Sequence, residues 1–276
     1  MEYNTYIENQ LLDIYMSEMD DIVEAAGAEL FEFNALLEAE GTELSTEVKP
    51  DDEAKSKNKK AKLKEIFEKL KIYIDKFIEA FNRIIDIVKT KITKLAPLVA
   101  GKFKVAGKAE DDITILKFDV AKTNAANIDK IIKDVDDQII KPIDGNQPPK
   151  TDTLDDFRTK FEEIDYSKVT KDEKNLMQFK KGAVIRNNVF AGLSTTATDI
   201  SKTIEQEAPR NREFKKILNN IIPQVERSED DATENLQLLN RALYFAIQLH
   251  RDVARYNTKL LGDLEYMSKH CAAVSG

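Results

Sequence analysis

Apolar side chains between residues 62 and 96 recur at alternating steps of four and three, with charged residues at most of the other positions. This spacing places them on one face of an α-helix and continues through several heptads. At ~1.5 Å per residue the helix is on the order of 50 Å long, and Pro97 and Gly101 are expected to end it. The apolar positions are Leu63, Phe67, Leu70, Ile74, Phe77, Phe81, Ile85, Val88, Ile92 and Leu95.

A second long stripe with helical spacing runs from Ala232 to Cys271. It predicts a C-terminal helix of ~40 residues, on the order of 60 Å long. The first 40 residues also follow helical steps, which Gly27 interrupts. Shorter helices are expected near 120–141, 154–163, 171–190, 194–207 and 212–225.

The apolar period changes to two in the stretches KFKVA (102–106) and ITILKFD (113–119). Gly107 lies in the link between them, so we expect a β-hairpin near 102–119. The chain has only 9 Gly and 7 Pro, too few turn formers for a many-stranded sandwich or barrel. The expected fold class is therefore mainly α: an elongated helical bundle with long heptad-like helices and a small β-hairpin insertion.

Charge divides the chain into unlike parts. Residues 1–53 hold 16 acidic residues and one lysine, a net charge of -15, whereas residues 54–104 carry a net charge of +10. The stretch 41–61 has few large apolar residues and is expected to be a flexible polar linker. The expected organisation is an acidic helical arm at 1–40 (a candidate propeptide), this linker, and a mainly helical body over 62–276.

Cations gather on the polar face of the 62–96 helix. Such a face can contact DNA phosphates without sequence specificity or lie on an anionic membrane surface, although it is more commonly the solvated side of a helical bundle. The aromatic residues of the seam are expected in the core rather than stacked on bases. The candidate contact residues are Lys64, Lys69, Lys71, Lys76, Arg83, Lys89 and Lys91.

Candidate catalytic chemistry is sparse. The two histidines, His250 and His270, are separated by ~30 Å of helix, so they cannot share a metal ion. Cys271 adjoins His270, but neighbouring helical residues point about 100° apart, which gives no Cys–His dyad. The sequence has no phosphate-binding glycine loop and no nucleophile-elbow motif. We therefore expect a non-enzymatic protein with no catalytic residue, cofactor or metal.

The sequence gives no sign of a membrane-spanning or exported chain. No apolar run approaches the ~18–20 residues that cross a bilayer, so no transmembrane segment is expected. The N-terminus MEYNTYIENQ lacks the basic and apolar regions of a secretory signal.

The opening segment EYNTYIENQLLDIYMSEMDDIVEAAGAELFEFNALLEAEG, followed by a polar tract and a Lys/Ile/Phe-rich helix, resembles internal virion proteins of large tailed bacteriophages. The resemblance extends over residues 1–120. It implies a structural protein made in the host cytoplasm and packaged inside the capsid with other virion proteins. It also implies that a maturation protease cuts the acidic segment away at a Leu/Ile-x-Glu site.

Leu36-Leu37-Glu38, followed by Ala39, is the best-placed site of this kind, because it lies at the junction with the polar tract. Leu30-Phe31-Glu32 also fits the motif. Residues 1–38 contain ten acidic and no basic residues, so their loss would change the net charge from -8 to +2. A chain of that charge tolerates packed DNA better than the intact one, and until the cut the acidic arm would mask the basic helix.

Two other classes of function remain open. One is a coiled-coil assembly or adaptor protein that self-associates through its heptad helices. The other is a membrane-active protein that lies on a lipid surface through the cationic amphipathic helix 62–96.

Overall fold

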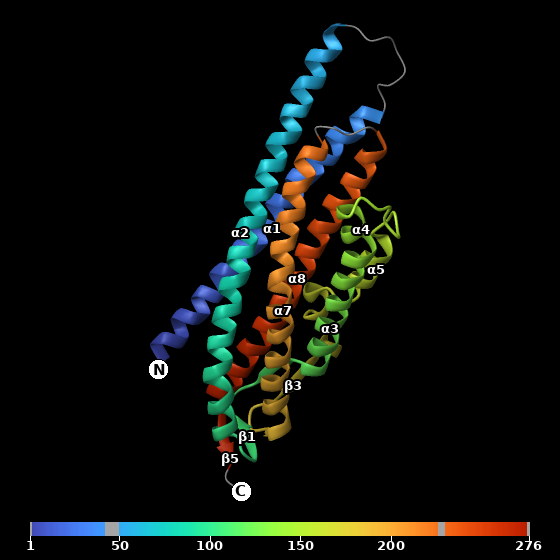
Figure 1. The fold of residues 1–276 in the computed structure, drawn as a ribbon. Coiled ribbons are helices and arrows are strands. Elements are labelled where there is room, and N and C mark those ends of the chain that lie inside the picture. Colours follow the sequence, from blue (N-terminus) through green and yellow to red (C-terminus); the bar gives the residue numbers. More distant parts are fainter. Residues whose placement is uncertain (1, 42–49, 226–229, 275–276) are drawn as a thin grey trace.

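The computed structural model describes residues 2–41, 50–225 and 230–274 of the chain. Four long helices lie lengthwise and give the molecule an elongated shape (Figure 1). They are α1 (Glu2–Gly41), α2 (Pro50–Lys102), α7 (Asn187–Val225) and α8 (Asp230–His270). The mainly α fold class is confirmed, and it follows from helices that each bury one apolar stripe against the others.

Shorter elements cover one side of α7 and α8 (Figure 1). The chain there is still mostly helical, and one π-helical turn directly follows α3. These elements are α3 (Phe118–Val135), the π turn (Asp136–Ile140), α4 (Lys141–Asp144), α5 (Asp155–Glu162), α6 (Tyr166–Val169) and a 3-10 turn (Glu173–Asn175).

Helix α2 is longer at both ends than the sequence predicted. It begins at Pro50, so residues 50–61 of the expected linker are helical, while 42–49 lie outside the described residues. Proline at a first helical position has no N–H to leave unpaired. Pro97 does not end the helix either. Its ring is exposed, while Leu95 and Val99 on either side continue the buried seam, and that packing outweighs the one lost backbone hydrogen bond.

The expected β-hairpin at 102–119 is corrected. Strands β1 (Ala106–Ala109) and β2 (Ile113–Leu116) do form there, but they do not pair with each other. β1 lies between β4 (Val184–Arg186) and β5 (Cys271–Val274), and β2 pairs with β3 (Leu176–Phe179), all antiparallel. Local alternation predicts a strand but not its partner, because distant segments supply the pairing.

Three of the shorter expected helices also differ. Residues 171–186 hold a 3-10 turn, β3 and β4, and only 187–190 are helical, as the start of α7. The strands form because the ribbon 106–116 pairs with the ribbon 176–186. Gly182, at φ 85°, makes the turn between β3 and β4. The segments 194–207 and 212–225 join into the single helix α7.

Helix α1 is part of the core and not a free arm. Met19 and Phe33 are fully buried against α2 and α8, in one continuous hydrophobic cluster that includes Phe81 and Leu243. Gly27 does not interrupt α1. A Cβ atom there would meet the Tyr244 hydroxyl group, so the glycine allows α1 and α8 to approach closely.

Candidate functional site

Acidic α1 lies against the cationic side of α2, and ion pairs join the two helices near both ends. Lys62 Nζ lies 2.7 Å from Glu32 Oε1, and Lys69 Nζ lies 3.4 Å from Glu29 Oε1. Further toward the N-terminus of α1, Lys94 pairs with Glu8. The opposite charges that the sequence places in separate segments therefore meet within one chain.

Most of the seven cations that the sequence singled out are occupied by contacts within the protein. Lys69 and Lys91 contact α1, and Arg83 contacts both Tyr15 of α1 and Glu79 of its own helix. Lys71 pairs with Glu68 and Lys89 with Glu205 of α7, whereas Lys64 and Lys76 are exposed. All seven residues belong to α2, but because most of them are paired they do not form one open cationic face.

Lys91 departs most from the expectation, because it is buried and not on a surface. Its Nζ lies 3.1 Å from Glu265 Oε2 of α8 and donates to Asn9 Oδ1 of α1. Asn9 Nδ2 donates to Glu265 Oε1 at 3.0 Å, and Lys269 Nζ lies 2.6 Å from the same oxygen. Burial acts to raise the pKa of Glu265, but the hydrogen bond from Lys269 and the charge of Lys91 outweigh it and keep that pKa low.

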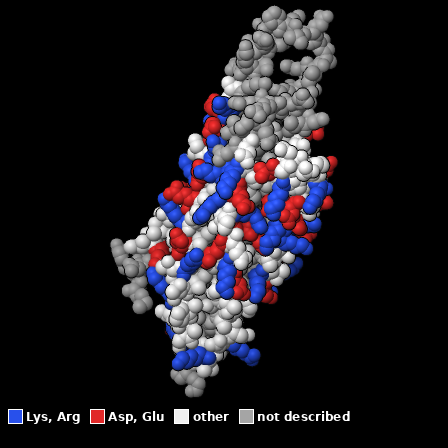
Figure 2. All heavy atoms as spheres, viewed as in Figure 1, with Lys and Arg blue, Asp and Glu red and all other residues white. Residues whose placement is uncertain are grey.

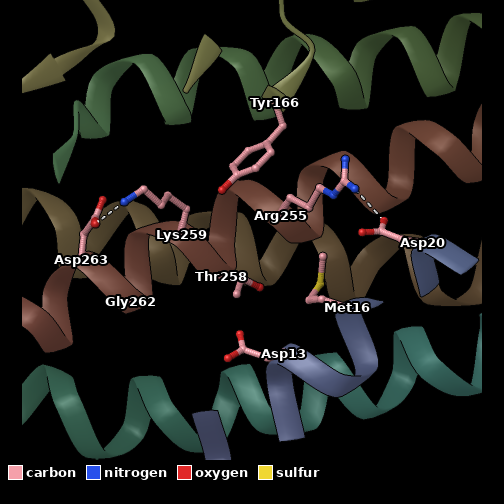
Figure 3. A pocket seen from close by; sticks show the side chains of 9 residues that line it. All are labelled: Asp13, Met16, Asp20, Tyr166, Arg255, Thr258, Lys259, Gly262 and Asp263. Atoms are coloured by element: carbon pink, nitrogen blue, oxygen red, sulfur yellow. Dashed lines mark hydrogen bonds and ion pairs between the residues drawn. The ribbon is translucent and has the colours of Figure 1, made fainter. Parts of the chain in front are cut away.

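Beside this cluster, a hollow of about 320 Å³ opens between α1 and α8 (Figure 3). An adjoining hollow of about 410 Å³ shares Asp13, Thr258 and Gly262 with it, so the two form one groove along the helix pair. The first hollow is lined by Asp13, Met16, Asp20, Tyr166, Arg255, Thr258, Lys259, Gly262 and Asp263.

Charges in the groove are mostly neutralised in pairs. Arg255 Nη2 lies 2.7 Å from Asp20 Oδ1, and Lys259 Nζ lies 2.5 Å from Asp263 Oδ1 (Figure 3). Beneath them, fully buried Asp252 accepts a 3.0 Å hydrogen bond from the Tyr166 backbone N–H. Burial raises the pKa values of Asp252 and Asp263. Ion pairs in the groove therefore connect α1 to α8. His270 lines its second hollow, and neither hollow has a cysteine or serine among its lining residues.

The two histidines and the cysteine have different surroundings. His250 is buried and contacts Glu207 of α7, whereas His270 is partly exposed, with Nδ1 3.0 Å from Asp111 Oδ2. Cys271 is buried in β5, and burial raises the pKa of its thiol to about 11. A thiol with that pKa is a poor nucleophile near neutral pH.

A second buried polar cluster was not predicted from the sequence. Glu207 Oε2 lies 3.0 Å from His250 Nε2 and 2.6 Å from Arg210 Nη1, and Arg210 Nε lies 3.6 Å from Asp136 Oδ2. Burial acts to raise the pKa of Glu207, but the contact with His250 and the charge of Arg210 outweigh it, so the pKa lies below its usual value. Glu207 and Arg210 at i and i+3 were the only local signal of this cluster.

The expected cleavage site lies at the C-terminal end of α1. Leu36 is half-buried and packs against the core. The backbone at Glu38 and Ala39 belongs to the last turn of the helix, and their side chains lie outside the described residues.

Three broader observations complete the description of the site. Within the described ranges, no group of three or more His, Cys, Asp or Glu side chains is placed to hold a metal ion. None of the described helices is both long and apolar enough to cross a membrane. The chain matches no protein-family model, no curated protein and no solved structure.

Proposed function

We propose that the protein is a non-enzymatic structural protein of a bacteriophage virion, carried inside the head, in which acidic α1 covers the cationic side of α2. The observation that carries this proposal is the set of ion pairs from α1 to its neighbours, which includes Lys62–Glu32, Lys69–Glu29 and Arg255–Asp20. A helix held in this way lowers the positive potential of α2 before DNA enters the shell. The phage resemblance of the opening segment supplies the biological setting.

The proposed maturation step is a cut between Glu38 and Ala39. It would leave α1 bound without a covalent link, because Met19 and Phe33 are buried in the bundle. Release of α1 would then leave Lys62, Lys69 and Lys94 without their acidic partners on α1, in a chain of net charge +2. Cations without partners bind DNA phosphates in a salt-dependent way.

Peptide mapping of the protein from purified particles tests the proposal. We expect peptides that begin at Ala39 and salt-dependent retention of the 39–276 fragment on DNA. Glu38→Gln should block or shift the cut, whereas Glu24→Gln, in the equally matching sequence Ile22-Val23-Glu24, should leave it unchanged. Absence of the protein from particles, or an intact N-terminus in infectious particles, would overturn this function.

An assembly or adaptor protein is the second candidate, and one specific observation favours it. Ile7, Leu11 and Ile14 of α1 lie at steps of four and three and are exposed. Such a stripe suits pairing with a second copy of the same helix. Sedimentation equilibrium of the intact chain tests this candidate, because self-association that Ile14→Asp abolishes would support it and a monomer at all concentrations would exclude it.

A further inference from the structure

The three-stranded sheet lies at the end of the bundle (Figure 1), and among the described residues one of its faces carries mostly exposed side chains. Its inner face packs on the stacked rings of Phe103 and Phe190, whose centroids are 4.1 Å apart. The outer face consists of two cross-strand rows, which we call the end face. The first row is Val184, Lys108 and Ala272, all exposed. The second is Arg186, Ala106 and Val274, in which Arg186 is exposed, Val274 is partly exposed and the central Ala106 is buried.

The end face combines aliphatic side chains with cations. Val184 is 63% exposed, and Val105, directly before β1, is 56% exposed. Lys108 and Arg186 on the face and Lys104 at its border are exposed, and none of the three forms an ion pair with another residue in the described part of the chain. In Figure 2 the lower end of the molecule carries uncharged surface with Lys or Arg at its margins.

Acidic residues near the end face do not cancel this charge. Asp112 pairs with Lys180 at 3.0 Å, and Asp111 contacts His270. Among the described residues near the face, Glu110 and Asp111 are the acidic residues without a Lys or Arg partner, and they stand against the three cations Lys104, Lys108 and Arg186. The end face therefore keeps a local positive charge, in contrast to α2, where the cations are mostly paired.

We propose that the end face binds the surface of an anionic phospholipid bilayer. Lys104, Lys108 and Arg186 would contact lipid phosphates, and Val105 and Val184 would enter the boundary between headgroups and acyl chains. The face has no aromatic, amide or hydroxyl side chain to stack on or hydrogen-bond with bases, and DNA phosphates would leave its valines exposed to water. The side-chain chemistry thus favours a lipid surface over a nucleic acid.

The charge of the whole chain fixes the orientation of this contact. A protein of net charge -8 is repelled by an anionic surface over most of its area. Screening limits that repulsion to about 8 Å at physiological salt, so an elongated molecule can approach with one positively charged end. We infer end-on binding through the sheet, and not the side-on binding that an amphipathic α2 would give.

Co-sedimentation of the full-length protein with vesicles tests the proposal. We expect binding to phosphatidylcholine vesicles that contain phosphatidylglycerol, weaker binding at high salt, and none to phosphatidylcholine alone. Lys108→Glu with Arg186→Glu should lower the affinity by about tenfold or more. The matched control is Lys130→Glu with Lys216→Glu, which makes the same change in net charge at exposed sites outside the end face and should bind as the parent does.

Two further sets of variants separate a loss of lipid contact from a loss of folding and from DNA binding. Lys108→Gln with Arg186→Gln should also lose binding, which covers the case in which the charge reversals fail to fold. Val184→Ser should weaken vesicle binding by about threefold but leave any binding to duplex DNA unchanged. The proposal is overturned if vesicle binding is absent, if it does not need the anionic lipid, or if the control pair reduces it equally. It is also overturned if the end-face variants lose DNA binding and retain vesicle binding.

Discussion

The Nε2 atom of His250 lies 3.0 Å from the Oε2 atom of Glu207 and joins α8 to α7 inside the bundle. The other ring nitrogen, Nδ1, lies 2.7 Å from the carbonyl oxygen of Ala246. Each of the two ring nitrogens therefore faces an oxygen atom, one on α8 and one on α7. The rings of Phe81 and Phe214 approach the imidazole edge-on. His250 is therefore positioned to hold two helices together.

Replacing His250 should destabilise the fold much more than replacing His270. His250→Leu leaves the Glu207 carboxylate buried beside Arg210 without its second partner, and we expect a loss of about 3–5 kcal/mol in the free energy of unfolding. His270→Leu removes a half-exposed ion pair with Asp111 and should cost less than about 1 kcal/mol. Urea denaturation of the two variants measures the difference, and equal losses would contradict the structural role of His250.

The buried cluster of Asn9, Lys91 and Glu265 should make stability fall in acid. The pKa of Glu265 is lowered in the folded protein, so its contribution is present above the unfolded value of about 4.3 and is lost as the pH falls through the folded value. Glu265→Gln should therefore be less stable than the parent at neutral pH, with a gap that narrows in acid. A gap of constant size between neutral pH and about pH 3 would show that the carboxylate charge plays no part.

Two mid-helix glycines should respond in opposite ways to alanine. A Cβ on Gly27 would meet the Tyr244 ring and force α1 away from α8, so Gly27→Ala should cost about 1–3 kcal/mol. A Cβ on Gly262 would have no atom within 4 Å, so Gly262→Ala should gain about 0.5–1 kcal/mol from helix propensity. Thermal melts of both variants provide the measurement. Similar shifts in the same direction would mean that α1 does not pack closely at Tyr244.

The long helices could be predicted because their buried stripes are local in sequence. The seam through Leu70, Phe77 and Phe81 and the stripe through Leu243 and Leu260 are both buried as expected. Helix ends were less predictable. The expectation that Pro97 ends the helix rests on the cost of one missing backbone hydrogen bond. The helix continues through Pro97 because Leu95 and Val99, on either side of it, are buried in the core.

Partners that come from distant segments could not be predicted. The alternation of apolar and polar residues near β1 predicted a strand. Its partners are residues 184–186 and 271–274, and no periodic pattern in the sequence specifies which strands pair. Lys91 has the sequence context of a surface lysine and is buried because Asn9 and Glu265 approach from two other helices. The acidic and basic segments were recognised from charge alone, but their joining into one core depends on Met19 and Phe33.

The last prediction concerns the attachment of α1. Because Met19 and Phe33 are fully buried, a cut in the chain after α1 should leave the helix in place. We expect a protein with a site for a specific protease introduced within residues 42–49 to elute after cleavage as one species that contains both pieces. Its melting temperature should lie within a few degrees of that of the uncut protein, because the loss of a single link changes only the chain entropy.

A matched pair of variants shows whether packing holds α1. Met19→Asp places a charge without a partner in the core and should release α1 on cleavage, whereas Ile14→Asp changes an exposed position of the same helix and should not. The fragment 50–276 produced alone should melt at a lower temperature than the cleaved complex, because it exposes the surface that α1 covers. Separation of the pieces in the unsubstituted protein would instead make α1 a detachable arm, as the sequence first suggested.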